Sequence, residues 1–137
     1  MMREILFRGK TKAITGCPYN NGKPDGEWVV GYVFPDLGAM KIRQYETDRP
    51  ECNDYEVDPE TVGQYTGGTD KNRTKIFEGD IVQAFDYIYV IMWDSVRAMF
   101  YLRDPISRVS ADFYNYFGSD LTVIGNIYDT PELLKKE

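Results

Sequence analysis

The chain has 137 residues, enough for one domain with a buried core, and a formal net charge of -6. This negative net charge argues against a general nucleic-acid binder, whose surface is normally basic. The net charge describes the whole chain and does not exclude a local basic patch. Histidine is absent, which excludes Ser-His-Asp and Cys-His catalysis as well as His-ligated metal sites. The 2 cysteines are too few for a disulfide framework or a cysteine-ligated zinc site.

Neither a secretory signal nor a membrane span is expected from the hydropathy of the chain. The N-terminus places Ile5-Leu6-Phe7 between charged residues, and the longest nearly apolar run, Tyr87 to Trp93, is far too short to span a bilayer. We therefore expect a cytoplasmic protein. The 11 Tyr, 7 Phe and 2 Trp favour strands, because aromatic residues suit pleated, half-buried surfaces.

The first part of the chain predicts three strands. Residues 3–8 read as a short opening strand, and 27–34 carries apolar residues on both faces, which is typical of a central strand. Residues 40–45 alternate apolar with polar side chains, as a half-exposed antiparallel strand does. The acidic stretch 46–60 is expected to form a surface loop.

The middle of the chain is rich in turn signals. Asp58-Pro59-Glu60-Thr61 predicts one capped helical turn, because proline is tolerated at the first helical position. Residues 62–66 read as extended, up to Gly67-Gly68, and 70–73 as a hairpin turn in which Asn72 takes a positive φ. In Glu78-Gly79-Asp80, we expect Gly79 to adopt a positive φ and Asp80 to bond backbone amides.

Short strands dominate the last part of the chain. Residues 112–117 are ambiguous between a strand and a helical turn, and Gly125 permits a bulge or close packing. Thr130-Pro131 predicts a cap and a very short helix. The remaining strands are expected at 81–85, 87–93, 98–102 and 121–127. The spacing of the turns predicts a mainly β, antiparallel sandwich or barrel with marginal helices.

Candidate sites for metal or acid–base chemistry are weak. Glu78 and Asp80 form a pair of carboxylates, but a structural turn explains them better. A calcium-loop pattern begins at Asp70 and fails, because Lys75 stands where glycine is needed and Ile81 where a bidentate glutamate is needed. The acidic stretch 46–60 could hold a divalent ion or mimic nucleic-acid charge, but a solvated loop is the simpler interpretation. We expect no cofactor and no bound metal.

Two basic clusters could contact nucleic acid or a partner. Lys71, Arg73 and Lys75 surround the central turn, and a second group lies near the N-terminus at Arg3, Arg8, Lys10 and Lys12. With exposed aromatics they could contact phosphates and stack bases, or they could simply charge a sheet edge against aggregation. The aromatic residues Tyr87, Tyr89 and Trp93 are expected in the core, with some of them available to an interface.

Four segments resemble the YopX-like family: Met2–Arg8, Val57–Gly67, Asp70–Val82 and Val123–Leu134. They stand at the head, middle and tail of the chain. The resemblance implies a small phage or prophage protein with a mostly β fold that contains an SH3-like barrel element. The resemblance identifies no catalytic or binding residues in this chain. The hallmark positions are Pro59, Gly63, Tyr65, Gly67, Asp70, Asn72, Glu78, Gly79, Asp80, Gly125 and Asn126.

One position departs from that family pattern. Members commonly have glycine after Asp-Lys-Asn, whereas this chain has Arg73, so Asn72 is expected to carry any positive φ.

These observations lead to one set of functional expectations. We expect a single domain over 1–137, open to subdivision into an N-terminal β part, 1–66, and an SH3-like part, 67–137. Its expected role is that of a non-enzymatic interaction protein in the bacterial host cytoplasm, bound to an unknown host or phage protein or to itself as a homo-oligomer. Nucleic-acid binding by a small β-barrel is the main alternative, and a carboxylate-based or metal-assisted enzyme is a distant third.

Overall fold

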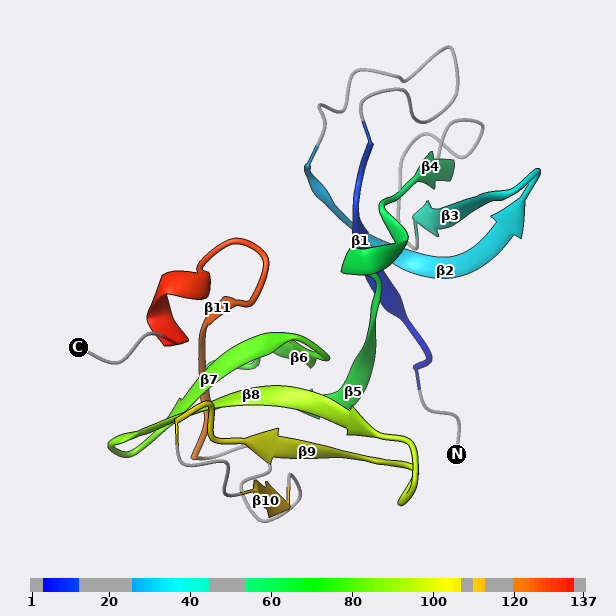
Figure 1. Ribbon diagram of the computed structural model, residues 1–137. Coiled ribbons are helices and arrows are strands. Elements are labelled where there is room, and N and C mark those ends of the chain that lie inside the picture. The colour runs from blue at the N-terminus through cyan, green and yellow to red at the C-terminus, as the bar shows by residue number, and fades with distance from the viewer. Residues whose placement is uncertain (1–3, 13–25, 45–53, 107–109, 113–119, 135–137) are drawn as a thin grey trace. The chain divides into compact units, whose positions relative to one another are not determined.

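A computed structural model describes residues 4–12, 26–44, 54–106, 110–112 and 120–134 (Figure 1). The chain divides into two compact units, Met1–Gln64 and Tyr65–Glu137. All strand pairs in the described part are antiparallel, and its helical elements are short 3-10 turns. The prediction of a mainly β fold is confirmed. Within the described ranges, no helix has the length and apolar content needed to cross a membrane.

The first unit is built on a sheet in the order β4-β3-β2-β1. Its elements are β1 (Phe7–Lys10), β2 (Trp28–Asp36), β3 (Ala39–Gln44), β4 (Asp54–Glu56) and the 3-10 turn η2 (Pro59–Thr61). A bridge between Thr11 and Val57 joins the end of β1 to the residue that follows β4, so the two edges of this sheet meet there. Val29, Ile42, Tyr55 and Val57 form the core that the curled sheet encloses.

The strand β5 (Gly63–Thr69) leads from the first unit into the second. Gly63 and Gln64 pair with β1, whereas Tyr65 and Thr69 pair with β6 (Lys75–Phe77).

The second unit is built mainly on a sheet in the order β10-β9-β8-β7-β11 (Figure 1). Its strands are β7 (Asp80–Ala84), β8 (Tyr87–Asp94), β9 (Met99–Arg103), β10 (Ser110–Asp112) and β11 (Thr122–Asn126), followed by the 3-10 turn η4 (Pro131–Leu134). One face of this sheet packs into a core of Ile76, Val82, Ala84, Tyr89, Ile91, Leu102 and Leu121. The register of β11 against β7 shifts between Val123 and Gly125, which agrees with the expectation of a bulge or close packing at Gly125.

Three boundaries differ from the predictions. The first strand begins at Phe7 rather than at residue 3, and β5 continues through both glycines to Thr69. The end of the acidic stretch is a strand rather than a loop, because Tyr55 pairs with Ile42 and is buried in the first core. The stretch from 45 to 53 and residues 113–119 lie outside the described ranges, so only Asp112 of the ambiguous 112–117 segment is placed, at the end of β10.

Four turns between consecutive strands hold a residue other than glycine in the left-handed region. These residues are Leu37 (φ 52°), Arg73 (φ 67°), Phe85 (φ 56°) and Ala98 (φ 54°). The expectation that Asn72 would take the positive φ is wrong, since its neighbour Arg73 does. Arg73 stands where the family pattern has glycine, the residue that adopts this conformation without steric strain.

The substitution Arg73→Gly is therefore expected to raise the free energy of unfolding by about 0.5–1 kcal/mol, because relief of the strain exceeds the added flexibility of the unfolded chain. Urea unfolding followed by Trp93 fluorescence would measure the change in the second unit, with Trp28 replaced by phenylalanine. The matched control is Asn72→Gly, which relieves no positive φ and is expected to be neutral or destabilising. Equal stabilisation by both variants would contradict the assignment of strain to Arg73.

Candidate functional site

Asp70 anchors the central turn of the second unit. Its side chain is only 4% exposed and accepts three backbone hydrogen bonds. The N–H groups of Asn72 (2.8 Å) and Thr74 (2.9 Å) donate to Oδ1, and that of Val123 (2.9 Å) donates to Oδ2. The N–H of Lys71 also donates to the carbonyl of Leu121 (3.0 Å), so the turn is tied to the chain leading into β11 at two points.

The electrostatics of Asp70 follow from these bonds. Burial alone would raise the pKa of this carboxyl, but the N–H groups of Val123, Thr74 and Asn72 outweigh burial and hold the pKa below its ordinary value. Both carboxylate oxygens are thus engaged by backbone donors. The calcium-like spacing that begins at Asp70 has a structural explanation, and the described residues contain no group of three or more Cys, Asp or Glu side chains placed to hold a metal.

Lys71, Arg73 and Lys75 are all exposed around this anchored turn. Lys71 and Arg73 lie in the turn itself, whereas Lys75 begins β6. The Lys75 ammonium lies 5.4 Å from the centre of the Tyr65 ring, which in turn packs at 5.6 Å against Phe77. The structure thus presents three cations on a short rigid segment, one of them over an aromatic ring.

Glu78, Gly79 and Asp80 form a tight turn between β6 and β7. Asp80 is buried, and its Oδ2 accepts from the Phe77 N–H at 2.7 Å. Gly79 has a φ of 92°, as predicted, and its N–H donates to the carbonyl of Ile91 (2.9 Å). These contacts show that Asp80 stabilises the turn. This agrees with the prediction that Glu78 and Asp80 belong to a structural turn.

The other hallmark residues also occupy structural positions. Pro59 opens η2, whose N-cap Asp58 accepts from the Glu60 N–H at 3.0 Å, so the predicted capped turn is confirmed. Gly67 has a φ of 93° within β5, where Gly63 and Tyr65 are buried. Asn126 Oδ1 accepts from the N–H groups of Tyr128 (3.0 Å) and Asp129 (2.9 Å) after β11.

A surface that the sequence did not indicate lies on the outer face of the first sheet. Trp28, Tyr32 and Phe34 alternate along β2 with core-facing residues, and basic side chains from the neighbouring strands lie over two of their rings. The guanidinium of Arg8 lies 4.6 Å from the ring centre of Trp28, and that of Arg43 lies 5.2 Å from Phe34. Only the strand register brings these residues together, which is why the sequence offered no direct signal.

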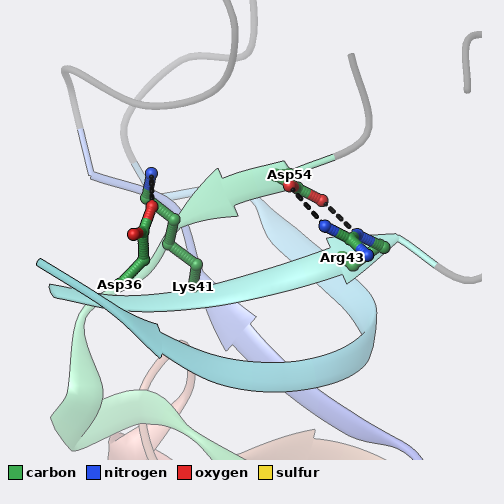
Figure 2. Close-up of polar contacts among 4 residues, drawn as sticks. All are labelled: Asp36, Lys41, Arg43 and Asp54. Atoms are coloured by element: carbon green, nitrogen blue, oxygen red, sulfur yellow. Dashed lines mark hydrogen bonds and ion pairs between the residues drawn. The ribbon is translucent and has the colours of Figure 1, made fainter. Parts of the chain in front are cut away.

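Carboxylates compensate the positive charge of Lys41 and Arg43 on that face. Figure 2 shows Arg43 paired with Asp54 through two hydrogen bonds of 2.8 and 3.1 Å, and Lys41 paired with Asp36 at 2.9 Å. The hydrogen bond to Asp36 raises the pKa of Lys41, and the bond to Asp54 raises the pKa of Arg43. A phosphate would have to compete with these carboxylates, so this face is poorly suited to bind nucleic acid.

Apolar side chains are exposed at the turns of three hairpins. Leu37 is fully exposed between β2 and β3, Phe85 is 73% exposed between β7 and β8, and Val96 is 91% exposed between β8 and β9. In the predicted aromatic stripe, Tyr89 is part of the core, whereas Tyr87 (59% exposed) and Trp93 (43%) are accessible near the two ends of β8. Leu37 and Phe85 also carry the strain of a positive φ.

Comparison with known proteins gives a match to one family model. The family model described as YopX protein matches residues 34–135. A search of curated proteins finds no match.

Proposed function

The chain belongs to the YopX protein family, and from this premise we propose that it is a non-enzymatic interaction module that binds a protein partner. The observation that carries the proposal is Phe85, a large aromatic side chain that is 73% exposed in a turn where its φ is 56°. Glycine, asparagine or aspartate would form such a turn at lower energetic cost. A strained backbone conformation at a residue with an exposed aromatic side chain is typical of a functional site.

Tyr87 extends this surface. It lies two residues from Phe85, is 59% exposed, and its ring packs at 6.3 Å against the buried Tyr89. Exposed aromatic residues that pack against a buried residue are common anchors of protein interfaces, because they bury much area at a small cost in side-chain entropy. The partner suited to this turn has an apolar pocket that accepts the Phe85 ring, with Tyr87 at its margin.

The substitution Phe85→Gly is expected to separate stability from binding. It relieves the positive φ, so the free energy of unfolding should stay the same or rise by up to about 1 kcal/mol, while partner binding falls at least tenfold. The control Ala98→Gly relieves a similar φ without removing an aromatic ring, and its binding should be unchanged. Affinity purification from cells that contain the partner, followed by titration with the purified partner, would measure both. Unchanged binding by Phe85→Gly would contradict the proposal.

The setting of this role is part of the proposal. As the family resemblance implies, we place the protein in phages or prophages and in the cytoplasm of the bacterial host, so prophage-induced cells are the source for the purification. A second copy of the chain is one candidate partner, and light scattering on the purified protein would detect such a homo-oligomer. We also infer an SH3-like barrel element in the second unit, supported by its short antiparallel strands around one core. An experimental structure of that unit would test the barrel.

Nucleic-acid binding through Lys71, Arg73 and Lys75 is a second proposal. The observation that favours it is the rigid turn on which Asp70 holds these exposed cations. Binding to single-stranded DNA or RNA should then weaken steeply with salt and should be lost when all three are changed to glutamine. The absence of binding at low salt would end this proposal.

A further inference from the structure

The second unit contains a groove of about 310 Å³ on the side of its sheet that faces away from the core. The lining residues come from β8, from β9 and the residues that follow it, and from the segment after β11. They are Val90, Met92, Arg103, Pro105, Ile127 and Leu134.

The strand register explains why these side chains gather. Along β8, Tyr89 and Ile91 face the core, so Val90 and Met92 face the opposite side. Val90 pairs directly with Arg103 of β9, and residues paired in this way share a face of the sheet. The guanidinium is therefore placed beside an apolar surface by the backbone itself.

The C-terminal segment is held over the same face. Gly125 lets it approach closely, since a Cβ at this position would lie 2.0 Å from Thr130 Oγ1 and 3.0 Å from Leu133 Cδ1. The Asn126 N–H donates to Thr130 Oγ1 at 3.0 Å, and the Thr130 N–H donates to the Asn126 carbonyl at 3.0 Å. The wall that carries Ile127 and Leu134 is thus fixed to β11 by packing and hydrogen bonds.

Arg103 lacks a carboxylate partner among the described residues, unlike several other basic residues of the chain. In the described part of the chain, Lys12, Lys41, Arg43 and Arg97 each pair with a carboxylate. Arg103 makes no such pair with a described residue, and the adjacent Asp104 accepts from the Ile106 N–H at 2.8 Å. A largely apolar groove with one available guanidinium suits an anion that has an apolar body.

We propose that this groove binds a small amphiphilic carboxylate, an acyl or aryl acid whose apolar part lies against Val90, Met92, Ile127 and Leu134 and whose carboxylate meets Arg103. The size of the groove suits a small molecule, since ligand pockets begin at roughly 300 Å³. The site shares no residue with the Phe85 turn, so it stands independently of the proposed partner surface.

Titration of the full-length protein with octanoate, 1-octanol and acetate at pH 7 would test this inference. Methyl NMR signals of Met92 and Ile127 should shift on addition of octanoate. Octanoate should bind about three- to tenfold more tightly than 1-octanol, because only the former meets the guanidinium, and acetate should leave the signals unchanged. Equal affinity for octanoate and octanol, a response to acetate, or shifts confined to residues outside the groove would overturn the proposal.

Two variants test the role of Arg103, whose exposed side chain can be changed without disturbing the core. Arg103→Gln should abolish the preference for octanoate over octanol, and Arg103→Lys should retain part of it. The exposed Arg97→Gln variant removes one charge from the turn between β8 and β9 and should bind both probes as the native chain does. A preference that survives in Arg103→Gln would also overturn the assignment, and circular dichroism would verify that each variant is folded.

Discussion

Asp70→Asn is expected to lower the free energy of unfolding by about 2–3 kcal/mol. Asparagine has nearly the same shape, and its oxygen can still accept from Asn72 and Thr74. Its amide nitrogen, however, replaces the oxygen that accepts from Val123, so two donors meet and the partly buried Val123 N–H loses its acceptor. The remaining bonds are also weakened, because hydrogen bonds to a carboxylate are stronger than those to a neutral amide.

Urea unfolding monitored by Trp93 fluorescence would measure this loss in the second unit. The matched control is Asp94→Asn, since Asp94 also accepts backbone N–H bonds in a hairpin turn, from Val96 and Arg97, but in an exposed setting. Its loss is expected to stay below about 1 kcal/mol, because water can satisfy the freed donors. Losses of equal size in the two variants would show that burial of Asp70 does not determine its contribution.

The lowered pKa of Asp70 also predicts how stability depends on pH. In the folded state the carboxyl binds a proton less readily than in the unfolded state, whose pKa is about 3.9. Its contribution is therefore fully present above that value and is lost as the pH falls through the folded pKa. The native chain should lose more stability between pH 5 and pH 3 than Asp70→Asn does. Parallel pH profiles for the two proteins would contradict this.

Gly31→Ala is expected to cost at least about 3 kcal/mol and to unfold the first unit in mild urea. Gly31 lies in the middle of β2, paired with Phe7 of β1 and Gln44 of β3. A Cβ there would lie 1.8 Å from the carbonyl oxygen of Arg43, an atom of the backbone that cannot rotate away. The strands would have to separate, and the hydrogen bonds between β2 and β3 would be lost.

Gly38→Ala is the matched control for this substitution. Gly38 lies in the turn between β2 and β3 with a φ of 83°, and a Cβ there would meet nothing within 4 Å. Its cost should be about 1 kcal/mol, from backbone strain alone. Trp28 fluorescence reports the first unit once Trp93 is replaced by phenylalanine. If Gly31→Ala costs no more than Gly38→Ala, the strands relax around the added methyl group and the predicted clash is absent.

The sequence predicted well the features that depend on neighbouring residues. The capped turn at Asp58-Pro59, the positive φ of Gly79 and the register shift at Gly125 all follow from the conformational preferences of those residues. The central position of β2 followed in the same way from its apolar residues on both faces. These preferences depend on residues that are adjacent in the sequence, so they can be predicted without knowing the tertiary contacts.

Predictions failed where a distant contact overrides local preference. Asn72 is the better residue for a positive φ, yet Arg73 takes it, in a turn whose backbone is already held by the three bonds to Asp70. Asp54–Glu56 reads as part of an acidic loop, yet it forms β4, because Tyr55 is buried against the first core. The groove around Arg103 likewise joins residues from three separate segments, which strand alternation alone could not connect.

The central segment from Val57 to Val82 shows this division clearly. By itself the sequence determined that the segment consists of a capped turn, a strand, a hairpin and a glycine turn, because each depends on the residues within it. Only the tertiary structure decided that Asp70 is a buried anchor, since its third hydrogen-bond donor is Val123, 53 residues further along the chain. The exposure of Phe85 and the position of Arg103 at the groove were decided in the same way, because exposure depends on which strands come to lie beside a residue.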